Sequence, residues 1–290
     1  MQKDLSKNLQ VAQTTISNYE KGIRFPDEDT LKKIARYFNV TLDYLFGYEP
    51  DNDFYLKQLN KQIRDTDINY DSMKLTPLAK LYMKSIMVGE KINARELLVD
   101  AIKKGENLSN IYIDVFDRTL REVGILWETN KIDVSNEHYF SEATQEVMSQ
   151  INMIKPRGEN KGHTFLSFSI GGELHNIGIK MVSNLLEMDG WNTYFFGTNV
   201  PSQSLIKAIN YYKADIIAIS STMSYTVNSV SDLINTIHSA HLIKMPKIIV
   251  GGATFNYDKT LWKKVHADGY SCNATDCVVL ANQLMKESIS

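Results

Sequence analysis

The stretch SIGGELHNIG, residues 169–178, holds the side chains with the clearest chemical use. It follows a β-rich run and places the carboxyl group of Glu173 two residues before the imidazole of His175. An imidazole on a loop at a strand end can coordinate a metal, and a nearby carboxylate can orient it through its other ring nitrogen. One histidine does not hold a bare ion. The stretch therefore predicts an axial ligand to a metal that a macrocycle already holds.

The glycines of this stretch do not have the spacing of a dinucleotide-binding turn. That turn reads G-x-G-x-x-G, whereas Gly171 and Gly172 are adjacent here and five residues separate them from Gly178. Glu173 would also repel a pyrophosphate, because both are negatively charged. The spacing therefore disfavours a phosphate site.

Small and hydroxyl-bearing residues follow the histidine at long intervals. Forty-one residues separate Gly178 from Ser220, which begins an SxT triplet that ends at Thr222. Twenty-eight more residues separate Thr222 from the pair Gly251 and Gly252, so the whole pattern is ExHxxG-x41-SxT-x28-GG. Glycine leaves room that any Cβ would fill, which lets a ligand approach the backbone closely.

This pattern resembles the signature of cobalamin-binding domains that bind their cofactor base-off, with a histidine as the lower cobalt ligand. The resemblance implies that His175 is that ligand and that the displaced dimethylbenzimidazole tail lies in a deep slot beside the sheet. The family often has Asp where this chain has Glu173, although Glu also occurs. The implied cofactor is adenosylcobalamin, with methylcobalamin as the other form. The implied contacts to it are Glu173, Gly178, Ser220, Thr222, Gly251 and Gly252.

A second pattern lies in the helical region before this domain, where nine residues separate Trp127 from the pair Glu137 and His138. This Wx9EH pattern, with NARELL and IYIDVFDRTLREVG upstream, resembles the methionine-synthase-like cap of CarH-type, adenosylcobalamin-dependent photoreceptor repressors. The resemblance covers about residues 77–285. It implies that Trp127 packs over the adenosyl group, with Glu137 and His138 beside it. The alternative is a core tryptophan and a solvated Glu-His pair.

One position departs from the CarH-type pattern. In that family a histidine directly after the tryptophan can take the upper cobalt position once light has cleaved the cobalt–carbon bond. Here that position is Glu128, and His138 is the nearest substitute by sequence. Cobalamin binding and light sensing are therefore separate expectations.

Residues 2–47 resemble a helix-turn-helix of the Cro/phage-repressor type, with TTISNYEKG, a proline and LKKIARYFNVTLDYLFG in succession. In that family the second helix of the motif lies in the major groove of double-stranded DNA. The alternative is a small helical interaction module. Amide, hydroxyl and ammonium groups suit base edges and phosphates, and the candidates are Gln13, Thr14, Thr15, Ser17, Asn18 and Lys21.

This region also departs from its type. Such domains normally have five helices, and the chain begins where the second should start, so we expect a domain without its first helix. Gln10 and Ala12 replace the usual turn glycine and N-cap serine. CarH-type proteins mostly carry a different, winged DNA-binding domain, so that resemblance does not extend to residues 1–47.

The spacing of apolar residues predicts a multidomain fold. An all-α helix-turn-helix spans 1–47, a polar linker spans 48–74, and an antiparallel four-helix bundle that begins at Thr76 and Pro77 spans 75–155. Over 160–290, the β-rich runs HTFLSFSI, WNTYFFG, ADIIAIS and KIIVGG alternate with helices. This alternation predicts an α/β, doubly wound parallel sheet of the flavodoxin-like Rossmann class, with its ligand at the carboxyl ends of the strands.

Bulk composition excludes several classes of function. The net charge of −2 gives no global basic field, so DNA contact requires a local patch. No signal peptide and no apolar run of about 18 residues is present, which predicts a cytoplasmic protein without a membrane partner. Cys272 and Cys277 fit neither a redox pair nor a zinc knuckle and are expected to be reduced core thiols. No catalytic constellation is present, so we do not expect an enzyme.

These features together predict a cobalamin-binding transcriptional repressor. Its DNA binding and its assembly into a dimer or tetramer would depend on adenosylcobalamin, and on light through cleavage of the cobalt–carbon bond. The alternative is a corrinoid carrier for methyl transfer, which shares the bundle-plus-sheet architecture but has no use for a DNA-binding head. A third reading, a regulatory domain that lost its cofactor, is disfavoured by His175 and the intact spacing.

Overall fold

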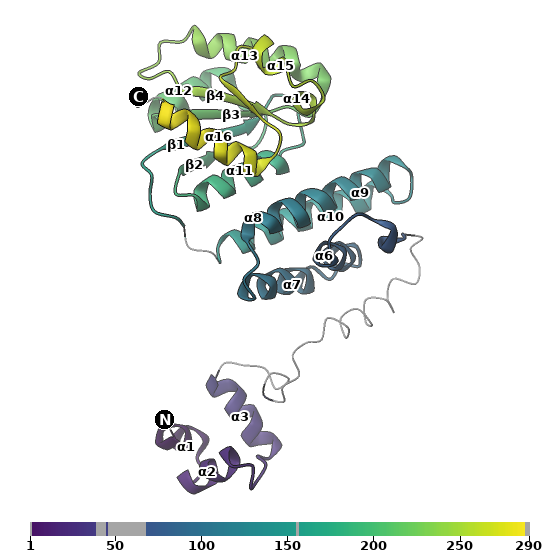
Figure 1. Cartoon of the computed structure of the whole chain (residues 1–290), viewed down its shortest axis with the longest axis vertical. Coiled ribbons are helices and arrows are strands. Elements are labelled where there is room, and N and C mark those ends of the chain that lie inside the picture. Colours follow the sequence, from purple (N-terminus) through teal and green to yellow (C-terminus); the bar gives the residue numbers. More distant parts are fainter. Residues whose placement is uncertain (1, 39–44, 46–67, 155–156, 288–290) are drawn as a thin grey trace. The chain divides into compact units, whose positions relative to one another are not determined.

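The computed structural model describes residues 2–38, 45, 68–154 and 157–287 (Figure 1). The chain forms two compact units, Met1–Thr66 and Asp67–Ser290. Apart from Leu45, the helix expected over TLDYLFG lies outside the described residues, as does segment 46–67. Within the described residues no helix combines the length and apolar character needed to cross a membrane.

The first unit contains α1 (Gln2–Leu9), α2 (Gln13–Glu20) and α3 (Glu28–Phe38). The buried side chains of Leu9 and Ile16 bring these short helices together. The turn between α1 and α2 has the two weaknesses that the sequence indicates. Gln10 adopts a left-handed conformation with φ 57°, and Ala12 caps α2 without a side-chain hydrogen bond. Both choices cost stability relative to glycine and serine.

The second unit begins with a helical bundle, which we call the cap. Its side chains meet in a buried aromatic core, where Tyr82 makes edge contacts with Phe116 and Phe140. Thr76 accepts a hydrogen bond from the Ala79 N–H at 3.2 Å, which confirms the predicted N-cap. The elements are η2 (Tyr70–Ser72), α6 (Pro77–Met87), α7 (Lys91–Lys103), α8 (Leu108–Asn110), η3 (Ile111–Asp117), α9 (Arg118–Glu128) and α10 (Val134–Asn152).

Two local features of the cap differ from the sequence expectation. The apolar spacing of NLSNIYIDVFDRTLREVGILWETN predicts a single α-helix, but the middle of this stretch, Ile111–Asp117, is a π-helix between α8 and α9. In addition, Ile68 and Tyr70 are buried, so the end of the segment assigned to a linker packs against the bundle. Lys84 lies over the ring of Tyr70 at 5.1 Å.

Five parallel strands follow in the order β2-β1-β3-β4-β5, the flavodoxin-like order that the sequence predicts. They are β1 (Thr164–Ser169), β2 (Asn192–Phe195), β3 (Ile216–Ser220), β4 (Lys247–Gly251) and β5 (Gly269–Ser271). The pairing sets Ser169 opposite Ser220, Ser220 opposite Gly251 and Gly251 opposite Ser271. The carboxyl ends of four strands therefore align at one edge.

Helices cover both faces of the sheet. On one face α12 (Ser202–Tyr212) and α13 (Val227–His238) bury Leu166, Phe168 and Ile219 in an apolar core. On the other, α11 (Ile177–Met188) and α16 (Ala274–Glu287) pack against each other. The remaining short helices are η4 (Ser224–Thr226), α14 (Ala253–Tyr257) and α15 (Leu261–Lys264). Strand β5 and the helices that follow β4 were not predicted from the sequence.

Helix α11 also contacts the cap. Its residues 180, 184 and 187 lie on one side of the helix, because they are four and three positions apart. The hydrogen bonds run from Lys180 Nζ to Ser149 Oγ at 3.3 Å, from Asn184 Nδ2 to Tyr112 OH at 3.0 Å and from Asn152 Nδ2 to Glu187 Oε2 at 3.3 Å.

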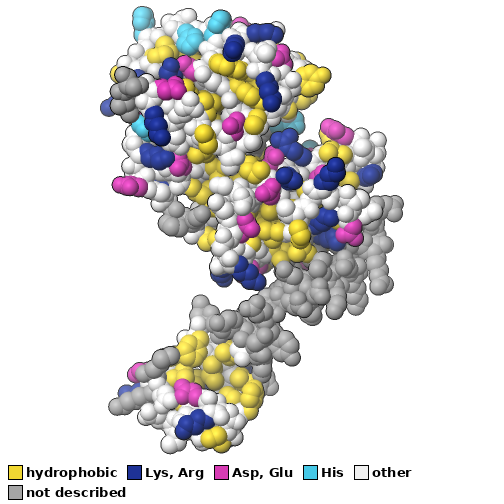
Figure 2. Space-filling model, viewed as in Figure 1, with side chains coloured by type: hydrophobic (Ala, Val, Ile, Leu, Met, Phe, Trp, Pro, Cys, Tyr) yellow, Lys and Arg dark blue, Asp and Glu magenta, His cyan; other side chains and the backbone are white. Residues whose placement is uncertain are grey.

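Acidic and basic side chains are mixed on the surface face that Figure 2 shows. Figure 2 shows acidic and basic side chains interspersed on that face, without a large area of one sign. This distribution agrees with the net charge of −2.

The turn between α1 and α2 yields a first prediction. Gln10→Gly and Ala12→Ser should each stabilise the helix-turn-helix by about 1 kcal/mol, since glycine tolerates positive φ and serine can cap α2. Slower amide hydrogen exchange in α1 and α2 of the full chain would show this. As the control, Lys7→Gly, at an exposed site inside α1, should speed exchange. Unchanged exchange in both turn variants would contradict the expected cost of this turn.

Candidate functional site

A cavity of about 450 Å³ is lined both by cap residues and by residues at the carboxyl ends of the strands. It lies where the sheet order reverses beside β1 and β3, the usual ligand position in this fold. Of the cofactor contacts that the sequence predicts, only Glu173 is absent from its lining. The predicted residues that line it are Trp127, Glu137, His138, His175, Gly178, Ser220, Thr222, Gly251 and Gly252.

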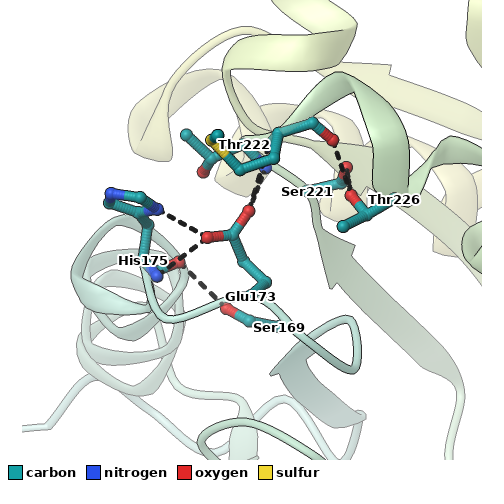
Figure 3. A network of polar contacts seen from close by, with 7 residues as sticks. Ser169, Glu173, His175, Ser221, Thr222 and Thr226 are labelled. Carbon is teal, nitrogen blue, oxygen red and sulfur yellow. Dashed lines mark hydrogen bonds and ion pairs between the residues drawn. The ribbon is translucent and has the colours of Figure 1, made fainter.

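His175 lies on the loop between β1 and α11, and its side chain is 66% exposed. Its Nδ1 atom is 2.5 Å from Oε1 of Glu173, whose side chain is only 1% exposed (Figure 3). Because an ionised carboxylate only accepts hydrogen bonds, Nδ1 carries the proton in this pair. The Nε2 lone pair of His175 then remains available to a metal, with the ring held in place by Glu173.

The Glu173 carboxylate also receives three backbone N–H groups. Oε1 accepts from His175 at 3.0 Å, and Oε2 accepts from Thr222 at 2.8 Å and Met223 at 3.1 Å. Burial alone would raise the pKa of Glu173, but the hydrogen bonds from His175, Thr222 and Met223 outweigh it and hold the pKa below its ordinary value. The carboxylate therefore stays ionised and ties the loop after β1 to the loop after β3.

Further hydrogen bonds fix these two loops (Figure 3). Ser169 Oγ donates to the backbone carbonyl of His175 at 3.1 Å. In the loop after β3, the hydroxyls of Ser221 and Thr226 are 2.6 Å apart, and Thr226 also donates to the carbonyl of Met223 at 2.7 Å. The imidazole is thus held by a preformed network.

The glycines of the pattern have different physical roles. Gly252 has φ 100°, and a Cβ there would lie 2.3 Å from the carbonyl oxygen of Ser221. The close approach of the loop after β3 therefore requires glycine at position 252. A Cβ on Gly251 would lie 3.2 Å from the carbonyl oxygen of Ser271. Gly178 is different, because a Cβ there meets no atom within 4 Å although the residue lines the cavity. Packing within the protein therefore does not explain Gly178.

Between the sheet and the pair α11 and α16, the cavity continues as a mostly apolar slot. Hydroxyl groups of Ser220 and Thr222 lie near the strand ends. The apolar lining comes from four elements of the fold: Ile179, Met181 and Val182 from α11, Ala218 from β3, Ile249 from β4, and Ala274 and Cys277 from α16. Such a slot suits a flat aromatic group.

The two cysteines differ in environment, although both line the cavity and neither forms a disulfide. Cys277 is buried, and burial raises the pKa of its thiol to about 12, so it stays protonated. Cys272 is exposed, so the expectation of two core thiols is wrong for this residue. Its position after β5, at the sheet edge, explains the exposure.

The cap contributes a polar wall around an exposed indole. Trp127 is 46% exposed and lines the cavity, so it is not part of the core of the cap. Glu137 Oε2 lies 2.6 Å from His138 Nδ1, and Glu137 Oε1 accepts from Ser141 Oγ at 2.8 Å. Glu128, which replaces the histidine of the CarH-type pattern, also lines the cavity.

Sequence reasoning missed part of this wall and all of α16. Asp117, Arg121 and Gly124 also line the cavity and precede Trp127 on the same side of the helix. These residues are three or four positions apart, which places them on the same side of a helix as Trp127. This spacing could have identified them as cavity residues from the sequence. The lining residues of α16 could not be identified from a local sequence pattern, because their position depends on which helices pack together on the sheet.

The predicted DNA-reading residues all lie on or next to α2, where buried Ile16 anchors the helix. Gln13, Thr14 and Lys21 are exposed, while Thr15, Ser17 and Asn18 are partly buried. Backbone carbonyls of Ser17 and Asn18 accept hydrogen bonds from residues 21, 23 and 24, which end the helix. The exposed residues are therefore the better placed to reach DNA.

The residues around the cavity fit a bound cobalamin. His175 presents a free Nε2, the slot beside the sheet offers apolar contact to a base, and Gly178 leaves space that no protein atom requires. Among the described residues, no group of three or more His, Cys, Asp or Glu could hold a metal ion.

Comparison with known families supports this assignment. Residues 164–278 and 78–152 match two family models, each described as a B12 binding domain, and residues 2–45 match a helix-turn-helix model. The dimethylamine corrinoid protein 1 of Methanosarcina acetivorans is 26% identical over 169 residues, 57% of this chain and 78% of that protein. The trimethylamine corrinoid protein 1 of Methanosarcina mazei is 27% identical over 192 residues, 64% of this chain and 86% of that protein.

The fold also has a solved counterpart. The monomethylamine corrinoid protein of Methanosarcina barkeri superposes with a TM-score of 0.63 at 18% identity, covering 72% of this chain and 98% of that one. At this identity the likeness shows the fold alone. The chain thus joins a helix-turn-helix to a helical cap and a parallel-sheet domain that both match B12-binding families, which supports a protein that binds cobalamin and DNA.

The two kinds of glycine in the cavity give a second prediction. Gly252→Ala should destabilise the protein by about 1–3 kcal/mol, because the new Cβ overlaps the Ser221 carbonyl. Gly178→Ala is the matched control and should not destabilise, since no atom lies within 4 Å of its Cβ. Chemical denaturation of protein prepared without cobalamin measures both. Equal stability of the two variants would contradict the packing role of Gly252.

Proposed function

We propose that this protein is a cytoplasmic, cobalamin-responsive repressor whose assembly on DNA depends on adenosylcobalamin. One observation carries the proposal. His175, locked by Glu173, lies on the same cavity as Trp127, Glu137 and His138, in a chain that also has a helix-turn-helix. A pocket shared by sheet and cap lets a bound ligand influence both.

Each group of residues has a defined task in this proposal. His175 would coordinate cobalt through Nε2, and Glu173 holds the imidazole in the tautomer that this requires. Residues of the slot, including Ser220 and Gly251, receive the displaced base. Bound cobalamin supplies a cobalt–carbon bond that light or cofactor chemistry can break. Trp127 and the Glu137–His138 pair would cover the side of the cofactor that faces the cap and exclude water from it.

The ligand state would control how the DNA-binding heads are presented. A dimer or tetramer formed in one ligand state would set two heads on a palindromic operator, because operator symmetry follows protein symmetry. In this scheme the protein catalyses no reaction. Glu128 occupies the position from which a second histidine would coordinate cobalt after illumination. The signal that changes assembly is therefore either light or the supply of cofactor.

A second candidate function is that of a corrinoid carrier in methyl transfer. The match of cap and sheet to methylamine corrinoid proteins favours it. Two features disfavour it. The helix-turn-helix would have no role in methyl transfer, and the polar wall beside Trp127 would face only a methyl group. DNA binding separates the two functions.

The lower ligand gives a third prediction. Wild-type protein purified in darkness with adenosylcobalamin should keep the cofactor and show a base-off absorption spectrum. His175→Ala should lose that spectrum and bind weakly, and Glu173→Gln should weaken binding by about 10–100-fold, as loss of an orienting partner does. The matched control is His138→Ala, which removes an imidazole from the same cavity but should keep the base-off form. A wild type that retains no cobalamin would refute the proposal.

DNA binding gives a fourth prediction. We expect the full chain to select a palindromic site from a random double-stranded DNA pool, with affinity that differs between cobalamin-free, dark and green-light-exposed protein. Gln13→Ala should cost about 1–3 kcal/mol and relax base preference at one position, whereas Lys21→Ala should lower the salt dependence without changing preference.

Sedimentation of the same samples would follow the oligomeric state. A parallel change in size and DNA affinity on illumination identifies light as the input. A change only with cofactor supply identifies a cobalamin sensor. If no sequence is selected in any state, the regulator proposal fails and the carrier function is favoured.

A further inference from the structure

Helix α9 contains a glycine at an unusual place. Gly124 lies in its interior, three residues after Arg121 and three before Trp127, and all three line the cavity. Glycine destabilises a helix interior relative to alanine, because it loses more backbone freedom on folding. A glycine at this position therefore needs a compensating reason.

Packing within the protein does not supply that reason. A Cβ built on Gly124 meets no atom within 4 Å, apart from the backbone of its own turn, so no neighbouring helix approaches it closely. Its φ is not in the left-handed region, since it is not one of the glycines with positive φ. Alanine would fit both the backbone and the available space.

A second departure from ideal helix geometry lies on the same wall. The π-helix Ile111–Asp117 directly precedes α9, and its residues Ile113 and Asp117 line the cavity. π-Helical turns are rare and are frequent at functional sites. Asp117, the last π-helical residue, accepts a hydrogen bond from Arg121 Nε at 2.9 Å, which holds that side chain toward the π-helix. Both departures thus fall where the helix faces the cavity.

The flanking side chains limit the size of the depression at Gly124. Arg121 lies one turn before it, and Trp127 and Glu128 lie one turn after it on the cavity side. Along the helix, the space left by the missing side chain of Gly124 is therefore bounded one turn before and one turn after it. A corrin ring is much wider than one residue, whereas a substituent that rises from its centre is not.

We propose that Gly124 determines specificity for the upper cobalt ligand by letting a large substituent lie against the α9 backbone. The inference rests on the proposed function, because it requires a cobalamin held from the opposite side by His175. The cap wall and His175 line the same cavity from different elements, so the wall would meet the side of the ring that His175 does not hold. Any side chain at position 124 would project into the space of that substituent and leave the ring and its tail untouched.

The test compares upper ligands of different size on the full chain. Gly124→Ala and Gly124→Leu are titrated in darkness with adenosylcobalamin, methylcobalamin and hydroxocobalamin, and affinities are read by calorimetry. Gly124→Leu should weaken adenosylcobalamin binding by about tenfold or more, with a smaller loss for alanine, while the two small-ligand forms should bind as to wild type. Melting temperatures of the cobalamin-free variants should equal or exceed that of wild type.

The control is Ile125→Ala, on the same helix but 51% exposed and not part of the cavity lining. It should leave all three affinities unchanged. If Gly124→Leu lowered the affinity for all three cobalamins equally, the obstruction would lie at the ring and the inference would be overturned. An unchanged affinity for all three would also overturn it. A wild type that binds none of the three would instead overturn the proposed function.

Discussion

The carboxylate of Glu173 receives an imidazole N–H and three backbone N–H groups while it is almost fully buried. A buried charge is tolerated only when it is fully hydrogen-bonded. This one can be satisfied only if the loops after β1 and β3 end side by side, which the pairing of Ser169 with Ser220 ensures. The parallel sheet, its register and the orientation of His175 therefore depend on one another through this side chain.

Much of this arrangement could be predicted from the sequence, because its key residues are defined by chemistry and follow strands of clear pattern. The intervals between His175, Ser220 and Gly251 reflect crossovers between neighbouring parallel strands, and apolar runs such as ADIIAIS mark the strands themselves. The N–H donors of Thr222 and Met223 could not be predicted, since every residue has such a group. Strand β5 has only three residues and the π-helix has no side-chain signature. Contacts between distant helices leave no local pattern.

Helix α11 connects the two halves of the cavity. It begins two residues after His175, and its hydrogen bonds to the cap come from Lys180, Asn184 and Glu187. These contacts are polar, and polar contacts can be exchanged with water at lower cost than apolar ones. The histidine loop and the cap thus both contact α11. At these points, polar contacts and not an apolar core hold the cap to this helix.

Under the proposed function, the turn at Gln10 would have a consequence for gene control. A left-handed glutamine and an uncapped α2 each lower the stability of the small head, so part of the free energy of DNA contact would be used to order the head. A single head would then bind DNA weakly. Occupancy of a site depends on local concentration, which rises steeply once two heads are tethered to one body. A modest change in assembly at the cobalamin end would be converted into a sharp change in promoter occupancy.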